Sequence, residues 1–269
     1  MVTTHLLRIL LVCGLALSSV EMNISAADPA VATKEDPFVN SLGMRFVRVP
    51  ADKHNAILLV SIWDVRVIDY KAFLGSSPPR SYDKPSFAQG STHPIVDVTW
   101  TDAKAFCRWL TQREQASGLI PKTAAYRLPT DVEWSYAAGI GAREAKVGTP
   151  HSKAEVIKDN AWGRARRPPK NVGNLGVKWR VDKYRFTSPV GSFRPNQFGL
   201  YDMVGNVWQW CEDLWDPNDS QYREYRVMRG TSWFDGPDGN RCISARYAGD
   251  PDSFGDDTGF RCVLDLAFF

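Results

Sequence analysis

Histidine is scarce in this chain, which has 269 residues and only four His. The three that follow the N-terminal segment are His54, His93 and His151, and no pair of them has the spacing of metal ligands. A strong charge of one sign is also missing, because the net charge is only +3. These absences disfavour a histidine-bound metal centre, and they give no argument for binding to nucleic acid or to an anionic membrane.

Heptad patterns, internal repeats and low-complexity tracts are absent beyond the N-terminal segment. The remaining sequence has the composition of a soluble globular protein, with 43% hydrophobic and 23% charged residues. Its length allows one large domain or two small ones, and it is ample for a buried core.

The first 27 residues resemble an export signal. A weakly basic start with His5 and Arg8 precedes a short apolar run at residues 9–17, and small residues follow at 25–27. The run is too short to span a bilayer. A buried N-terminal helix is the alternative, but residues 28–36 have the character of a linker. We therefore expect a signal peptide at 1–27, a linker at 28–35, one domain at 36–269, and a mature protein without a membrane span that is periplasmic, on the cell surface or secreted.

The cysteine content is consistent with export. Loss of the signal would remove Cys13 and leave four cysteines: Cys107, Cys211, Cys242 and Cys262. An even number in an oxidising compartment favours disulfide bonds, and four cysteines allow three connectivities. The residues alone leave that connectivity open.

Several segments in the first half carry clear signals of regular structure. Alternation of apolar and polar residues over 40–50 predicts a strand. Helical spacing of apolar residues predicts helices over 67–74 and 101–113, and Cys107 falls on the buried stripe of the second. Thr130 and Glu133 have the spacing of a capping box, so Thr130 is expected to begin a third helix.

After about residue 140, Gly, Pro, Asn and Asp become dense, and short apolar runs alternate with turn residues. Long irregular stretches need fixing by metals, disulfides or aromatic packing, and the ten Trp residues supply the last of these. We predict an α+β fold, irregular and loop-rich, with a few helices and short strands.

Six sequence blocks carry a family resemblance. They are Asn-Ser-Leu-Gly-Met-Arg-Phe at 40–46, His-Pro-Ile-Val-Asp-Val-Thr-Trp at 93–100, Tyr-Arg-Leu-Pro-Thr at 126–130, Phe-Gly-Leu-Tyr-Asp-Met-Val-Gly-Asn-Val-Trp at 198–208, Arg-Gly-Thr-Ser-Trp at 229–233 and Gly-Phe-Arg at 259–261. In content and order they resemble the formylglycine-generating enzyme, or sulfatase-modifying factor, family. The resemblance implies that family's irregular fold, which is related to the C-type lectin fold. Active members oxidise a sulfatase cysteine to formylglycine with copper and molecular oxygen.

The same resemblance implies a catalytic position that this chain does not fill. In active members, cysteines two and seven positions after the Trp of the Gly-x-Ser-Trp block bind Cu(I), a soft ion that prefers sulfur. Counting from Trp233 places Asp235 and Asn240 there, and their hard oxygens offer little to Cu(I). An alignment slip could bring Cys242 near the second position, but the first would stay empty. We expect no catalytic residue and no copper here, and we expect Ser232, which matches a residue lining the family's oxygen pocket, to be structural.

The resemblance also suggests a pairing of the cysteines. Cys107 and Cys262 match positions that resemble a disulfide pair of the family. A second bridge would then join Cys211 to Cys242. The alternatives are two buried thiols or a displaced redox pair at Cys211 and Cys242; the apolar surroundings of Cys211 argue against a reactive thiol.

Two structural calcium sites are a further implication of the resemblance. The first would use Asp202, the carbonyl groups of Gly205 and Val207, and the side chain of Gln209. Oxygen ligands at short intervals on one looped segment suit calcium, which accepts six to eight oxygens in loose geometry. The second would use Asn174, Asp182 and the carbonyl groups of Leu175 and Tyr184. The alternative for both sets is that these residues only build turns.

Three functions fit these observations. The first is a non-catalytic binding or accessory module, whose groove would take a peptide, protein or glycan ligand, with a sulfatase among the candidate partners. The second is a formylglycine-generating oxidase with an atypical site. The third is a catalyst of different chemistry on the same fold.

Two features are expected to be structural: a solvated acidic loop with Asp252, Asp256 and Asp257, and ion pairs or carbonyl caps at Arg229 and Arg261.

Overall fold

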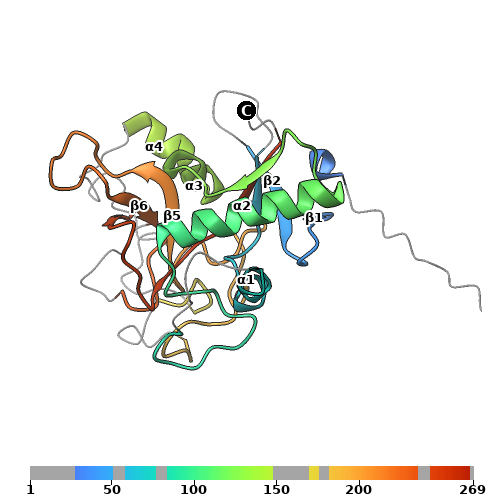
Figure 1. Cartoon of the computed structure of the whole chain (residues 1–269). Coiled ribbons are helices and arrows are strands. Elements are labelled where there is room, and N and C mark those ends of the chain that lie inside the picture. The colour runs from blue at the N-terminus through green and yellow to red at the C-terminus, as the bar shows by residue number, and fades with distance from the viewer. Residues whose placement is uncertain are drawn as a thin grey trace, which may run out of the picture.

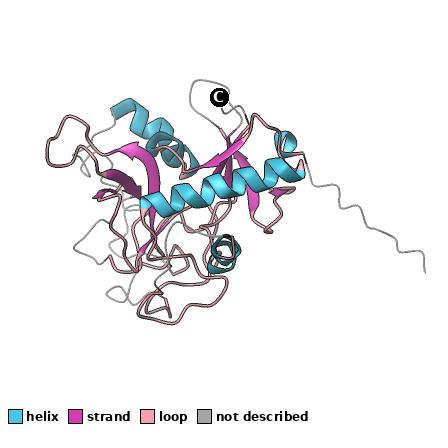
Figure 2. Ribbon diagram, viewed as in Figure 1, coloured by secondary structure: helices cyan, strands magenta, loops and turns pink. Residues whose placement is uncertain are grey.

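The computed structural model describes residues 28–50, 58–76, 84–147, 170–175, 182–235 and 243–266. The expected signal peptide at 1–27, Asn240 and Cys242 lie outside these residues. The described chain forms two β-sheets and a small set of helices that long loops connect (Figure 1, Figure 2). This is the predicted α+β class with few helices and short strands.

The first sheet has the strand order β1-β2-β3-β9-β4, and all its neighbours are antiparallel. Its strands are β1 (Phe38–Val39), β2 (Arg45–Val49), β3 (Leu58–Ser61), β4 (Ala125–Arg127) and β9 (Val263–Asp265). The last strand of the chain therefore lies between β3 and β4. The strand predicted over 40–50 is confirmed for 45–49, while its first residues form a turn in which Gly43 has a φ of 74°.

The second sheet has the order β7-β6-β5-β8. Its strands are β5 (Trp208–Leu214), β6 (Arg226–Arg229), β7 (Arg246–Gly249) and β8 (Thr258–Gly259). β5 and β6, and β6 and β7, pair in antiparallel fashion, whereas the short β8 runs parallel to the start of β5. This parallel pair brings the segment just before residue 258 alongside Trp208.

The helices follow the capping signals of the sequence. They are η1 (Pro29–Val31), α1 (Val67–Leu74), α2 (Trp100–Ser117), α3 (Asp131–Ala137) and α4 (Gly141–Val147). Thr130 caps α3 and forms the predicted capping box with Glu133. Thr99 and Asp102 make an equivalent box at α2, which ends at Gly118 in the left-handed conformation. The predictions of α1, α2 and α3 are confirmed, and α2 is longer than predicted.

Helix α2 packs against both sheets and runs in Figure 1 from beside β5 toward β1 and β2. Its buried face, which includes Phe106, Cys107 and Leu110, belongs to one core cluster with Phe46 of the first sheet and Trp210 of the second. Burial of each such large side chain stabilises the fold by about 1.5–3 kcal/mol. The inward orientation predicted for Cys107 is confirmed.

Buried arginines connect the sheets to the helices. Arg229 on β6 is fully buried and lies 3.2 Å from both Asp131 and Glu144. Arg261, just before β9, lies 3.2 Å from the buried Asp64. The predicted ion pairs of Arg229 and Arg261 are therefore confirmed. Within the described ranges, no helix is both long enough and apolar enough to cross a membrane.

Candidate functional site

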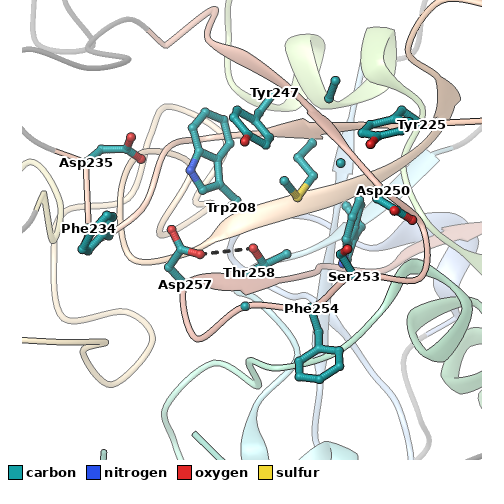
Figure 3. A pocket seen from close by; sticks show the side chains of 15 residues that line it. Trp208, Tyr225, Phe234, Asp235, Tyr247, Asp250, Ser253, Phe254, Asp257 and Thr258 are labelled. Carbon is teal, nitrogen blue, oxygen red and sulfur yellow. Dashed lines mark hydrogen bonds between the residues drawn. The ribbon is translucent and has the colours of Figure 1, made fainter. Parts of the chain in front are cut away.

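A pocket of about 630 Å³ opens on the second sheet, beside the family-like block at 229–233 (Figure 3). Strands β5, β6 and β7 form its floor, and the segments around residues 234–235 and 250–258 form its sides. Its lining comprises Trp208, Trp210, Tyr225, Met228, Phe234, Asp235, Tyr247, Ala248, Gly249, Asp250, Ser253, Phe254, Gly255, Asp257 and Thr258.

The strand pairing explains the floor of the pocket. Met228 lies opposite Tyr247 in the β6–β7 pair, and Trp208 lies opposite Thr258 in the β5–β8 pair. Gly249 packs directly on the ring of Trp210. A Cβ added at this position would lie 2.5 Å from Cη2 of Trp210, which is too close for any side chain. Only glycine therefore lets β7 approach β5 and β6 so closely.

Aromatic rings form much of the wall. The rings of Trp208 and Tyr247 lie 5.9 Å apart, tilted by 41°. Phe234, Tyr247 and Phe254 are 66%, 53% and 52% exposed, although large apolar side chains are usually buried. Exposed aromatic residues gathered around one cavity are typical of a binding surface.

Two carboxylates meet beside Trp208 (Figure 3). The Ser232 hydroxyl lies 2.8 Å from Oδ2 of Asp257 and 3.1 Å from Oδ2 of Asp235. The Ser232 backbone N–H also donates to Asp235, at 2.8 Å. Since Ser232 has one hydroxyl proton, it can donate fully to only one of the two carboxylates at a time.

Burial changes the proton affinity of both acids. Desolvation raises the pKa of Asp235, and the nearby charge of Asp257 raises it further, against the hydrogen bonds from Ser232. Desolvation also raises the pKa of Asp257, and the charge of Asp256 adds to this effect. The pocket therefore holds two acidic groups that gain protons more readily than ordinary aspartates.

The sequence prediction about the acidic loop is wrong for Asp257. Asp252 is exposed as expected, but Asp257 is partly buried, lines the pocket and accepts a hydrogen bond from Ser232. The reason is the parallel β5–β8 pair, in which the Trp208 backbone N–H donates to the Asp257 carbonyl at 2.8 Å. This non-local contact draws the start of β8 into the second sheet.

The residues at the family's catalytic position do not offer Cu(I) a thiolate. Asp235 lines the pocket, and Ser232 and Trp233 lie immediately behind it, with the Trp233 indole donating to the Asp256 carbonyl at 3.1 Å. No cysteine lies among the described residues that line the pocket. Carboxylate oxygens are poor ligands for Cu(I), so the described side chains here do not fit that ion.

The first candidate calcium set is only partly suited to a cation. Asp202 is buried, and its Oδ1 has no hydrogen-bond partner among the described residues. Gln209, however, already uses its side chain: Oε1 accepts from Trp134 and Arg261, and Nε2 donates to the Asp202 carbonyl at 2.8 Å. Gln209 is therefore not available as a ligand. The side-chain oxygen that remains free in this set is Oδ1 of Asp202, beside the carbonyl groups of Gly205 and Val207.

The second candidate set fits a cation better. Asn174 Oδ1 and Asp182 Oδ2 are both buried, and neither has a hydrogen-bond partner among the described residues. Asp182 Oδ1 accepts from the Tyr184 N–H at 2.7 Å. The structure thus joins Asp182 and Tyr184 of this set. Two buried oxygens without partners are what a hard oxygen-seeking ion would complete.

The described cysteines are all buried. The sulfur atoms of Cys107 and Cys262 lie 3.6 Å apart, across α2 and the residue before β9. Cys211 lies in β5, where desolvation raises its pKa well above the usual value. The partner expected for Cys211 lies outside the described residues.

Sequence reasoning missed most of the pocket. Tyr247, Asp250 and Phe254 carry no motif, and strand pairing and loop packing alone bring them together. Trp208 was part of a family-like block, but nothing in its sequence context indicated that this buried side chain would line a pocket. Exposure of several aromatic residues on one face is a property that appears only after folding.

Comparison with known proteins adds to this geometry. The profile described as the sulfatase-modifying factor enzyme 1-like domain matches residues 28–266. The inactive C-alpha-formylglycine-generating enzyme 2 of Bos taurus is 34% identical over 175 residues, a match that covers 63% of this chain and 50% of the relative. The formylglycine-generating enzyme of Streptomyces coelicolor is 34% identical over 188 residues, covering 64% and 53%. PvdO from Pseudomonas aeruginosa, a solved structure, has a TM-score of 0.58 and 25% identity, covering 84% of this chain and 96% of its own.

The chain spans about half the length of these curated relatives. One of the two is named inactive and the other is named as the enzyme, yet both are 34% identical to it. Overall sequence identity therefore does not distinguish a catalytic from a non-catalytic member. Individual side chains at the pocket are what can distinguish them.

Proposed function

The chain belongs to the sulfatase-modifying factor enzyme 1-like family, as its six sequence blocks predicted, and on this premise we propose that it is a non-catalytic binding or accessory module. Its ligand would be a peptide, a protein or a glycan that enters the pocket on the second sheet. A sulfatase is one candidate protein partner. The observation that carries the proposal is the environment of Asp235.

Asp235 stands two residues after Trp233, where active family members are expected to have the first copper-binding cysteine. Its carboxylate accepts hydrogen bonds from the backbone N–H and the hydroxyl of Ser232 and lies next to Asp257. These contacts satisfy a carboxylate. They support a role for Asp235 as a buried acid, not as a remnant of a metal-binding site. Ser232, which the resemblance would assign to an oxygen pocket, instead holds two carboxylates together.

The thiols among the described residues support the same proposal. Cys107, Cys211 and Cys262 are buried and do not line the pocket. Burial raises the pKa of Cys211 well above its usual value, so little thiolate would form there at neutral pH. A thiolate is the form that binds metals and attacks disulfides, and this argues against a displaced redox pair at Cys211.

Structural calcium is a separate part of the proposal. The set of Asn174, Leu175, Asp182 and Tyr184 would hold the ion, because it contains two buried oxygens without hydrogen-bond partners. Such an ion would fix a loop rather than take part in chemistry. In the first set, Asp202 would supply the single free side-chain oxygen.

We also propose that the protein is exported. The apolar run at residues 9–17 and the small residues at 25–27 support a cleaved signal. Sequencing the N-terminus of the protein recovered outside the cytoplasm would locate the cleavage site. Recovery of an uncleaved chain only from the cytoplasm would contradict export.

Coexpression with a sulfatase tests the absence of catalysis. The sulfatase would carry the Cys-x-Pro-x-Arg motif, and mass spectrometry would follow conversion of its cysteine in a host without background activity. We expect no conversion by the wild-type chain and no tight binding of Cu(I) in competition with a chromogenic chelator. Conversion above background would overturn the proposal and favour the oxidase with an atypical site.

A matched double variant makes this null result informative. Asp235→Cys combined with Asn240→Cys restores sulfur at the two family positions. We expect this variant, unlike the wild type, to compete with the chelator for Cu(I), because two thiolates are soft ligands. Copper binding by both proteins would show that the ion uses other residues and would contradict the proposed role of Asp235.

A further inference from the structure

The pocket combines aromatic rings with negative charge. Six of its lining residues are aromatic and three are aspartates, namely Asp235, Asp250 and Asp257. None of the described lining residues is Lys, Arg or His. In the described part of the chain, no ion pair involves any of these three aspartates. The negative charge inside this cavity therefore has no described cationic partner within the protein.

From this charge and wall chemistry we propose that the pocket binds the lysine or arginine side chain of a partner polypeptide. The cationic group would lie against the carboxylates of Asp235 and Asp257, beside the exposed ring of Tyr247 and the edge of Trp208. The inference rests on the proposed binding function and names the ligand class of that site.

The carboxylate pair supplies the charge complementarity. Asp235 and Asp257 share the single hydroxyl proton of Ser232, at 3.1 and 2.8 Å. Two neighbouring carboxylates repel each other, and burial strengthens that repulsion. A cation between or beside them would relieve it, whereas an anion would increase it and a neutral ligand would leave it unchanged.

The aromatic wall supplies the second half of the recognition. Trp is the best aromatic partner for a cation, and an ammonium or guanidinium within about 6 Å of a ring centroid gains stabilisation. The fold uses this contact internally, with Arg226 4.0 Å from the ring centre of Trp100 and Arg229 4.5 Å from that of Trp134. Trp208 and Tyr247 also line the pocket (Figure 3), and of the two rings Tyr247, at 53% exposure, is the open one, while Trp208 is only 5% exposed.

The rim of the pocket favours a side chain on a polypeptide over a free amine. Phe234 and Phe254 are 66% and 52% exposed and lie on two different lining segments, the loop after β6 and the loop between β7 and β8 (Figure 3). A small amine inside the cavity would leave these outer rings largely in water. A polypeptide that inserts one cationic side chain could cover them with its flanking residues and bury their apolar surface.

Binding to a set of five-residue peptides tests the inference. Each peptide is blocked at both ends and has Lys, Arg, norleucine or Glu at its centre between identical neutral residues, and the mature full-length chain is titrated calorimetrically. We expect the Lys and Arg peptides to bind at least about tenfold more tightly than the norleucine and Glu peptides. Their affinity should fall as NaCl is raised, because the attraction is electrostatic.

Two further ligands separate the possible sources of the signal. Butylamine and butylguanidine represent the cation without a polypeptide, and they should bind more weakly than the peptides. If the free amines bind as tightly as the peptides, the partner polypeptide is excluded. If a neutral oligosaccharide binds while the Lys and Arg peptides do not exceed norleucine, the cation assignment is overturned and the pocket takes a glycan.

Matched variants assign any binding to the pocket. Asp235→Asn and Asp257→Asn remove one charge each while preserving size, and each should weaken Lys-peptide binding about tenfold. Asp252→Asn changes an exposed residue of the same loop that does not line the pocket, and it should leave binding unchanged. Wild-type affinity in both pocket variants, each still folded and unfolding cooperatively, would overturn the inference. The sulfatase and copper assays do not depend on these peptides, so failure here is distinguishable from failure of the proposed function.

Discussion

The Ser232 hydroxyl lies 2.8 Å from Oδ2 of Asp257, a residue 25 positions later in the chain. This hydrogen bond joins the loop after β6 to the residue that precedes β8. It also completes a bridge, because the same hydroxyl reaches Asp235. A serine that the family resemblance would assign to oxygen chemistry therefore holds two carboxylates at the edge of an acidic pocket in this chain.

Removal of that hydroxyl should destabilise the protein. Ser232 is fully buried, so Ser232→Ala would leave Asp257 and Asp235 without their shared donor. We expect a loss of about 1–3 kcal/mol in the free energy of unfolding, measured by denaturant titration. Ser253→Ala is the control, since Ser253 is exposed in the same pocket, and it should change stability by less than about 0.5 kcal/mol. Equal effects of the two substitutions would contradict the bridging role.

Local sequence signals predicted the helices well because their causes are local. The cap at Thr130 and its partner Glu133 are three residues apart, and the buried stripe of α2 lies within one segment. The family-like blocks predicted the fold class for a similar reason, since each block is a contiguous run of residues. These signals needed no knowledge of which distant segments would meet.

The pocket could not be predicted in the same way because its contacts are long-range. Strand β9 enters the first sheet between β3 and β4, and β8 runs parallel to β5. The second of these pairings moves Asp257 from an expected solvated loop to the side of Trp208. Counting from Trp233 singled out Asp235, which lines the pocket, but its partners are specified only by tertiary packing.

The close packing of β7 on the second sheet gives a second stability prediction. Gly249→Ala would place a Cβ 2.5 Å from Cη2 of Trp210 and 3.1 Å from Cε of Met228, so both side chains would have to move. We expect the free energy of unfolding to fall by about 1–3 kcal/mol and the pocket wall to be displaced. Gly75→Ala is the control, because its nearest neighbours lie at 3.6 Å or more and its backbone is right-handed. A Gly249→Ala variant with unchanged stability would show that this wall of the pocket is not closely packed.

The cysteine pair at the core is expected to be oxidised in the exported protein. Cys107 and Cys262 are 155 residues apart in sequence, and their sulfur atoms lie 3.6 Å apart, so a small rotation would bring them to the roughly 2.0 Å of a disulfide. A bridge that closes so long a loop should stabilise the fold by about 2–4 kcal/mol. Peptide mapping without reduction should find this pair linked, and Cys107→Ser should lower the melting temperature. Labelling of both cysteines by a thiol reagent in unreduced, denatured protein would contradict the bridge.

Calcium should raise the melting temperature if the second candidate set binds it. A ligand that binds only the folded state stabilises it in proportion to the logarithm of its concentration. We expect the midpoint of thermal unfolding to be higher in excess calcium than in chelator, and Asp182→Asn should abolish most of the difference. Asp219→Asn, a substitution of an exposed aspartate, should leave it intact. Identical melting curves of the wild type in calcium and in chelator would remove the support for both candidate sites.

The two pocket aspartates should give stability and ligand affinity opposite dependences on pH. Burial raises the pKa of both Asp235 and Asp257 in the folded state, so the folded protein binds protons more tightly than the unfolded chain. Their contribution to stability is then fully present below the usual aspartate pKa, and it is lost as pH rises through the raised values. Affinity for a Lys peptide should instead increase over the same range, because ionised carboxylates attract the cation.

The Asp257→Asn variant tests the expected pH dependence of stability and that of ligand affinity together. It removes one charge from the pair and also removes a cause of the raised pKa of Asp235, while Asp250, Asp256 and the hydroxyl of Tyr247 remain nearby. At about pH 8 the variant should therefore unfold at a higher temperature than the wild type, yet bind the Lys peptide about tenfold more weakly. Its remaining affinity should be lost at a lower pH on acidification, because the Asp235 carboxyl then titrates closer to its ordinary value. A variant that is both less stable and unchanged in the pH midpoint of binding would show that the two carboxylates do not interact, and the pocket would lose its basis as a cation site.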